Sequence, residues 1–478
     1  ESAMVFNSLI FLLFLAVVLP VYYRLQHRAQ NIFLLLASWF FYGWWDWRFL
    51  GLLWFTSLFD YYCAKWIEET DDARRQKFLL AGSMAVNLTV LGVFKYFNFF
   101  AASAVSLLHA FGFQADAPTL NVVLPLGISF YTFLSMSYTI DVYRRELKAT
   151  PNLVDYQLFV GYFPHLVAGP IVRASYLLPQ CERPRAIKSD QVVNGVWLVL
   201  LGFFKKVVIG DRLAQVVNWG FAGHAAPFAD ANAWLVLYAF AFQIYADFSG
   251  YSDIARGLSK LMGFELVENF NAPYLVTNPS AFWRHWHISL STWLRDYLYI
   301  PLGGNRGSRA RTYFNLLLTM LLGGLWHGAG AAYLLWGFFH GALLAIQRGW
   351  QQLRGQETFP PTTPNFFLRA LKIVLFFHVT CLGWLLFRAG SLPPGVSQVG
   401  MVKSFLHALF RLPHSLDAIA VGVLLLSAIG LLLQWKNDLM QRFVEWPTRW
   451  QATAVAAVLL AIAGLGVFEG AQFIYFQF

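Results

Sequence analysis

The chain has 478 residues, of which 35 are Lys or Arg and 25 are Asp or Glu, so charged side chains make up only 13%, whereas about a quarter is typical of soluble domains. Hydrophobic residues reach 58%, aromatic residues reach 18% and the mean hydropathy is +0.51. These values exclude a soluble enzyme, a disordered protein and a coiled coil, and they favour an all-α polytopic membrane protein.

The net charge of +10 does not indicate a nucleic-acid partner, because the basic residues are dispersed among apolar runs. The positive-inside rule explains them better. It predicts cytoplasmic loops for most of the four basic clusters, which are residues 24–28, 144–148, 205–206 and 305–311.

The three cysteines lie far apart, so no disulfide framework and no metal site are predicted. Residues 1–3 precede Met4 and are interpreted as a cloning remnant, and residues 4–478 as a single integral-membrane domain.

Charge-free runs locate the expected membrane spans, because a bilayer core needs roughly 20 apolar residues per helix. Four runs each qualify as one span: 5–23, 78–94, 117–140 and 418–435. Shorter or polar-flanked candidates are 31–45, 49–59 extended towards Trp66, 96–115, 191–204, 231–246, 373–387 and 452–468. The sequence therefore predicts about 11 transmembrane helices.

Two stretches interrupt this pattern. Residues 156–172 are apolar yet contain Pro164, Gly169 and Pro170, which predicts a re-entrant or protein-buried segment. Residues 312–347 carry no formal charge over roughly 36 positions, or about 54 Å of helix, so this segment must fold back. The expected breaks are Gly323-Gly324 and residues 328–330.

His327 lies between these two expected breaks, at membrane depth. Its unperturbed pKa near 6.5 suits a general base at neutral pH, and glycines beside it would let a substrate approach closely. The alternative is a buried structural histidine that binds a carbonyl exposed at the break. The residue type alone leaves both interpretations open.

Residues 282–300 have helical spacing with two faces. The aromatic face consists of Trp283, Trp286, Leu290, Trp293 and Tyr297, and the polar face of Arg284, His287, Ser291 and Arg295. This pattern predicts one helix at the interface or beside a wet cavity, with His287 on its polar face. His285 points away from His287, and no acidic cluster accompanies the pair, so no metal site is expected.

Asp247 and Asp253 end an apolar run with two carboxylates. The favoured interpretation is a structural junction that pairs with arginines such as Arg284 or Arg295. The functional interpretation is that these carboxylates orient a catalytic histidine. The Gly-x-Ser-x-Gly elbow of serine hydrolases is absent from the sequence.

Four strings together resemble the membrane-bound O-acyltransferase family. They are residues 283–306, residues 247–253, the Phe-Pro-His-Leu-Val-Ala-Gly-Pro string at 163–170 and the Gly-Gly-Leu-Trp-His-Gly-Ala string at 323–329. The likeness is strongest to the branch that acetylates exported polysaccharides such as alginate, and it is densest between residues 244 and 340.

This resemblance implies a fold and a site. The fold is a ring of helices around a central tunnel. The family's histidine in a Trp-His-Gly string falls on His327, and its second active-site histidine, in Trp-His-Ile-Ser, falls on His287. Trp326, Trp283 and Trp286 would then shape the tunnel, although packing alone explains these three residues equally well.

The resemblance also implies the chemistry, with no tightly bound cofactor. Acetyl-CoA would donate from the cytoplasm, and His327 would act as general base. Arg306, Arg309 and Arg311 would hold the donor phosphates, or they would be ordinary positive-inside residues. The acceptor would be a serine of a periplasmic partner acetyltransferase or a sugar hydroxyl of an exopolysaccharide. The expected location is the bacterial inner membrane.

Two alternatives stay open from the sequence. Other branches of the same family acylate peptidoglycan, cellulose, proteins or lipids. A secondary transporter would also place histidines and aspartates at membrane depth, but no internal repeat supports it.

Overall fold

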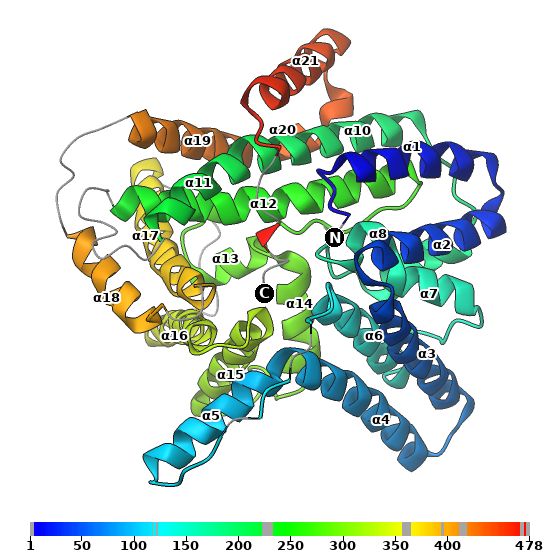
Figure 1. Cartoon of the computed structure of the whole chain (residues 1–478), viewed down its shortest axis with the longest axis horizontal. Helices are drawn as coiled ribbons and strands as arrows, with labels where there is room; N and C mark the ends of the chain where they lie inside the picture. Colours follow the sequence, from blue (N-terminus) through cyan, green and yellow to red (C-terminus); the bar gives the residue numbers. More distant parts are fainter. Residues whose placement is uncertain are drawn as a thin grey trace. The chain divides into compact units, whose positions relative to one another are not determined.

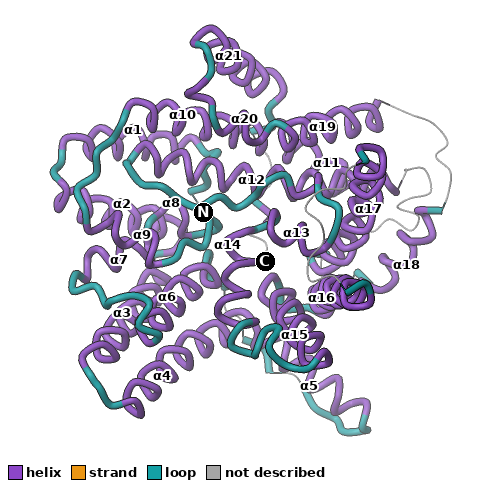
Figure 2. The backbone as a smooth tube through the Cα atoms, turned by 180° about the vertical axis from the view of Figure 1, so that it is seen from behind, coloured by secondary structure: helices purple, strands orange, loops and turns teal. Residues whose placement is uncertain are grey.

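The computed structural model describes residues 4–116, 118–120, 123–221, 233–355, 365–392, 396–410, 418–468 and 473–474. Within these ranges the chain forms helices and loops and no strand (Figure 2). This confirms the all-α prediction. The chain divides into two compact units, one of Glu1–Val196 with Ile254–Val267 and the other of Trp197–Asp253 with Glu268–Phe478.

Unit 1 contains the N-terminal helices (Figure 1). They are α1 (Leu9–Arg24), α2 (His27–Asp46), α3 (Arg48–Glu69), α4 (Ala73–Leu91), the π-helix η1 (Gly92–Tyr96), α5 (Phe97–Ala110), α6 (Ile128–Tyr143), α7 (Leu153–Gly161), α8 (Phe163–Leu166) and α9 (Ala174–Glu182). Two further helices, α10 (Ser189–Phe203) and α12 (Ala233–Leu261), run from one unit into the other.

Unit 2 contains the remaining helices. They are η2 (Phe204–Gly210), α11 (Asp211–Gly220), η3 (Pro273–Leu275), α13 (Pro279–His285), α14 (Ile288–Leu294), η4 (Arg295–Tyr299), α15 (Arg309–His327), α16 (Ala331–Leu353), α17 (Phe366–Gly390), α18 (Gln398–Leu409), α19 (Ala418–Trp435), α20 (Asn437–Gln441), η5 (Phe443–Glu445) and α21 (Thr448–Leu465).

Five helices of the described part are long and apolar enough to cross a membrane: Ala73–Ala110, Ser189–Gly220, Phe366–Gly390, Ala418–Trp435 and Thr448–Leu465. The first of them covers the two spans expected separately at 78–94 and 96–115, because the chain stays helical from α4 through η1 to α5. The span expected at 117–140 begins only at Ile128, after Gly127 in a left-handed conformation. A Cβ on Gly127 would lie 2.6 Å from the Leu166 carbonyl oxygen, so this turn requires glycine. Residues 117, 121 and 122 of that expected span, and 231–232 of the one expected at 231–246, lie outside the described residues.

The interrupted stretch at 156–172 is confirmed. Helix α7 ends at Gly161, the short α8 follows, and the chain is non-helical from Val167 to Arg173, while every residue from 156 to 172 is buried. The imidazole of His165 contacts the Phe159 carbonyl oxygen at 3.0 Å. This histidine therefore satisfies a backbone group that the helix break exposes.

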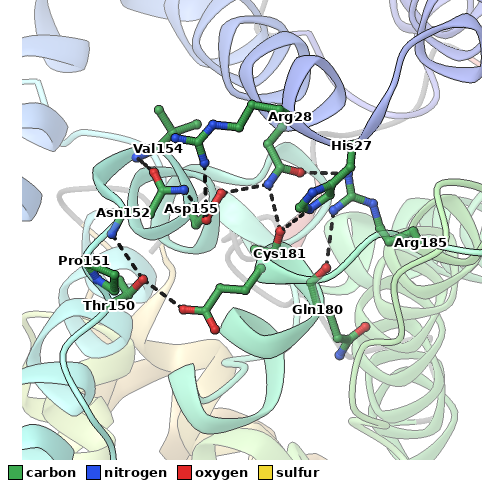
Figure 3. Close-up of polar contacts among 12 residues, drawn as sticks. His27, Arg28, Thr150, Pro151, Asn152, Val154, Asp155, Gln180, Cys181 and Arg185 are labelled. Atoms are coloured by element: carbon green, nitrogen blue, oxygen red, sulfur yellow. Dashed lines mark hydrogen bonds and ion pairs between the residues drawn. The ribbon is translucent and has the colours of Figure 1, made fainter.

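A polar junction holds α2, α7 and α9 of unit 1 together (Figure 3). The Asn31 amide donates to Asp155 at 2.7 Å and to the Cys181 carbonyl oxygen at 2.8 Å. Arg185 donates to the Asn31 oxygen at 2.7 Å, and the His27 ring lies 2.8 Å from the same Cys181 oxygen. These bonds satisfy buried polar groups from three helices, which fixes their mutual arrangement.

The fold-back predicted within residues 312–347 is confirmed, because α15 and α16 pack side by side along their lengths. The chain breaks at residues 328–330, as expected. The second expected break is wrong, because α15 continues through Gly323-Gly324 to His327. A Cβ on Gly324 would lie 2.2 Å from the Tyr333 carbonyl oxygen, and one on Gly337 would lie 2.3 Å from the Met320 carbonyl oxygen. These glycines therefore allow close helix packing, as small residues do in membranes.

We expect Gly324→Ala to destabilise unit 2 by about 1–3 kcal/mol or more, because the clash is with backbone atoms that cannot rotate away. The matched control is Gly323→Ala, where the added methyl group would meet only the Leu294 Cδ1 atom at 3.1 Å. Thermal unfolding in detergent measures both variants. Equal melting temperatures for the two variants would contradict the packing role of Gly324.

Candidate functional site

The single helix expected at 282–300 is wrong. The chain forms α13, breaks at Trp286-His287, and continues as α14 and η4. His287 lies at the break with φ of 42° and is fully buried, so it does not share an exposed polar face with Arg284 and Arg295. A left-handed conformation is unfavourable for a residue with a Cβ. Such strain persists only where the surroundings impose it, and it concentrates at functional sites.

Asn269 holds the ring of His287 in place. The His287 Nδ1 atom lies 3.3 Å from Asn269 Oδ1, which also accepts hydrogen bonds from the backbone N–H and the hydroxyl of Ser289. An amide oxygen can only accept, so Nδ1 of His287 carries the proton and Nε2 is the acceptor of the neutral ring. His287 lies outside the candidate membrane spans. Burial lowers its pKa to about 3, so the ring is neutral at pH 7.

His327 is the last residue of α15 and is 3% exposed. Three aromatic rings surround its imidazole: Trp326 at 4.9 Å, Trp336 at 5.0 Å and Phe387 at 5.2 Å between ring centroids. The Trp326 ring also contacts the ring of His287, at 6.0 Å. The structure therefore brings both predicted histidines to one tryptophan, although 40 positions separate them in the sequence.

A pocket of about 280 Å³ lies between α13, α14, η4, α15 and α16; neither histidine lines it, although Ile288, the neighbour of His287, does. The predicted residues Arg284, Ser291 and Arg295 line it, and so does Trp283. The wall formed by α15 includes Thr319, eight residues before His327 and so about 12 Å away along the helix. Arg295 is already paired with Asp296 at 2.6 Å, whereas Arg284 has no ion-pair partner within the described part of the chain.

The other predicted residues lie elsewhere. Arg306, Arg309 and Arg311 are exposed around the start of α15 and do not line the pocket. Trp286 is buried against Phe282 and Trp384. The ring of His285 contacts the Asn271 carbonyl oxygen, so it binds backbone.

The expected pairing of Asp247 and Asp253 with Arg284 or Arg295 is wrong. Asp253 pairs with Lys205 at 2.6 Å, and Asp247 pairs with Lys206 at 2.5 Å. Lys206 also contacts Asp211 at 2.9 Å. The cytoplasmic loop expected at 205–206 is therefore also wrong, because both lysines are buried in the π-helix η2, where each has a carboxylate partner.

We expect Lys206→Met to destabilise the protein by about 3–5 kcal/mol, because it leaves two buried carboxylates without their cation. The control is Lys65→Met, which removes an exposed i,i+4 pair with Glu69 at 4.0 Å and should change stability by about 0.5 kcal/mol or less. Melting temperatures in detergent test this pair. A Lys206 variant as stable as the Lys65 variant would refute the structural role of the buried lysine.

Sequence reasoning missed three residues of this region. Asn269 orients His287, and Trp336 and Phe387 complete the surroundings of His327. The spacing of Trp336 and His340 by four positions within α16 was a signal for Trp336, since it places both residues on one helix face.

The chain belongs to the membrane-bound O-acyltransferase family, because residues 39–387 match that family. It is therefore an acyltransferase and a multi-pass membrane protein, and the secondary-transporter alternative is not supported. The probable alginate O-acetylase of Pseudomonas aeruginosa is 44% identical over 92% of this chain and 83% of its own length. The peptidoglycan O-acetyltransferase of Helicobacter pylori is 33% identical over 99% of this chain and 98% of its own length. The teichoic acid D-alanyltransferase of Bacillus subtilis is 27% identical over 57% of this chain and 71% of its own length.

Proposed function

We propose that this protein is a membrane O-acetyltransferase that moves an acetyl group from a cytoplasmic thioester to an exported polysaccharide such as alginate. The observation that carries the proposal is the meeting of His327 and His287 at the ring of Trp326 inside unit 2. The 44% identity to an alginate O-acetylase over most of the chain supports the choice of acceptor.

In this proposal His327 is the general base. It takes the proton from the acceptor hydroxyl as that oxygen attacks the thioester carbonyl carbon, and it then returns the proton to the departing thiolate. His287 supports the reaction as a neutral ring, because its Nδ1 proton is held in a hydrogen bond to Asn269 Oδ1. Burial of both imidazoles strengthens their electrostatic interactions with the reacting groups.

The donor in this proposal is acetyl-CoA, and the pocket beside α15 receives the pantetheine arm of this molecule. Arg284 supplies a guanidinium there for an anionic group of the donor. The apolar side chains of Leu294, Met320 and Leu344 suit the uncharged part. Arg306, in the loop before α15, and Arg309 and Arg311, in its first turn, attract the phosphates on the cytoplasmic side.

The same proposal includes the location and the architecture that the family resemblance implied. The protein acts in the bacterial inner membrane as one domain, with a ring of about 11 helices around a tunnel. A periplasmic acetyltransferase receives the acetyl group on a serine before the polysaccharide does.

A labelled acetyl-CoA assay tests this function. The purified protein is incubated with radiolabelled acetyl-CoA and with alginate oligosaccharides, peptidoglycan fragments or teichoic acid, each with and without a periplasmic extract. We expect label on the alginate oligosaccharide and release of free CoA when the periplasmic extract is present. Preferential labelling of peptidoglycan or teichoic acid would replace the acceptor, and no transfer from acetyl-CoA under any condition would refute the donor.

A further inference from the structure

Three buried ring nitrogens belong to a cluster centred on Trp336, which contacts His327. The Nε1 atoms of Trp336 and Trp384 and the Nε2 atom of His340 have no hydrogen-bond partner among the described residues. All three side chains are 1% exposed. An unsatisfied buried donor costs about 1–3 kcal/mol, so a native structure that keeps several together calls for an explanation.

Trp336 is the member of this group that contacts His327. Their ring centroids are 5.0 Å apart and their planes are at 89°. The surroundings fix the orientation of Trp336: His340 lies 4.9 Å away on the same helix face, Phe387 lies 5.3 Å away, and Trp384 stacks on the indole at 6.1 Å and 22°. The indole ring, which carries one N–H donor, is therefore held in a fixed orientation beside the proposed base.

We propose that the indole N–H of Trp336 is an oxyanion donor in acyl transfer. This inference rests on the proposed function. As the acceptor oxygen bonds to the thioester carbon, the carbonyl oxygen takes up the electron pair of the C=O bond and becomes negative. The Trp336 N–H donates a hydrogen bond to this oxygen. The electron pair on this oxygen then reforms the C=O bond, the C–S bond breaks, and the proton on His327 passes to the thiolate.

The geometry favours this role over a packing role. A reacting group within hydrogen-bond reach of the His327 imidazole also lies close to an indole whose ring centre is only 5.0 Å away. A base and an oxyanion donor must both lie about 3 Å from the reacting group. The missing partner of the N–H is then the substrate, and the cost of leaving it unpaired in the resting protein is recovered in the transition state.

The test separates the N–H group from the ring. Trp336 is replaced by 3-benzothienylalanine, which keeps the shape of the indole and exchanges N–H for sulfur, and in a second variant by phenylalanine. We expect kcat for acetyl transfer to fall by about 10²–10³, the loss typical of a removed oxyanion donor. KM should change by less than about threefold, because the bond forms only in the transition state.

The stability measurement distinguishes function from packing. The benzothienyl variant loses an unsatisfied donor, so its melting temperature should be unchanged or higher. Trp384→Phe is the matched control, because Trp384 is equally buried, also carries an unpartnered N–H, and has ring contacts with Phe282, Trp286, Trp336 and Phe387. We expect its kcat to stay within about threefold of the parent value, because phenylalanine keeps an aromatic ring against Trp336 and Trp384 is not among the rings that contact His327 in the described part of the chain.

The outcomes keep this inference apart from the proposed function. A benzothienyl variant with parental kcat overturns the role of Trp336 and leaves the role of His327 intact. An equal loss of kcat in the Trp384 variant also overturns it, because the effect would then belong to the packing of the whole cluster. An active His327→Gln protein would instead refute the proposed base.

Discussion

His327→Gln is expected to abolish acyl transfer while leaving the protein folded. Glutamine fills much of the space of the imidazole between Trp326, Trp336 and Phe387, but it cannot take up and release a proton. General-base assistance typically contributes 10²–10⁴-fold. The variant should therefore lose roughly that factor in kcat, or about 3–5 kcal/mol of transition-state stabilisation.

His327→Ala should show a second defect. His327 is 3% exposed, so its removal leaves a cavity among three aromatic rings, and truncations of this size cost about 2–5 kcal/mol of stability. Thermal unfolding, acetyl-CoA binding and acetyl transfer are measured on both variants, with the exposed His109→Gln as control. A purely structural histidine would give the reverse pattern, in which glutamine supports full activity.

The sequence predicted those features that depend on the local pattern. The absence of charge over residues 312–347 required a fold-back, and the Trp-His-Gly and Trp-His-Ile-Ser strings identified the two histidines that Trp326 brings together. The length of a charge-free run and the identity of a motif can both be read without knowing what lies beside them.

The features that were mispredicted depend on contacts with distant segments. The spacing of residues 282–300 suits one helix, yet the Ile288 N–H donates to the Asn269 carbonyl oxygen, and the Asn271 N–H donates to the His285 carbonyl oxygen. These two backbone bonds to a distant loop compete with helical hydrogen bonds and break the helix at His287. Periodicity within one segment contains no information about such a competitor.

Lysine and glycine were misread for the same reason. Lys205 and Lys206 look like a cytoplasmic loop until their partners Asp253 and Asp247, more than 40 positions later, are known. Gly324 looks like a helix break until the Tyr333 carbonyl oxygen is found where its Cβ would be. In both cases a tertiary partner decides between two meanings of the same residue type.

The second large effect is expected at His287, where backbone strain and chemistry can be separated. Its φ of 42° favours glycine and tolerates asparagine, whereas alanine keeps the strain of a Cβ. His287→Asn and His287→Gly should therefore be more stable than His287→Ala, by about 1 kcal/mol for the glycine variant. All three lack the imidazole and should lose about 10–10³ in acetyl transfer.

His285→Ala is the control for this series, because His285 lies two positions away and its ring contacts the Asn271 carbonyl oxygen. Its transfer rate should stay within about threefold of the parent.

The pH profile supplies an independent check. Burial holds the pKa of His287 at about 3, so this ring does not titrate between pH 5 and 8. We therefore expect the activity of the parent and the residual activity of the asparagine variant to depend on pH in the same way. A shifted profile, or a glycine variant with parental activity, would show that His287 acts in another way than as a neutral ring held by Asn269.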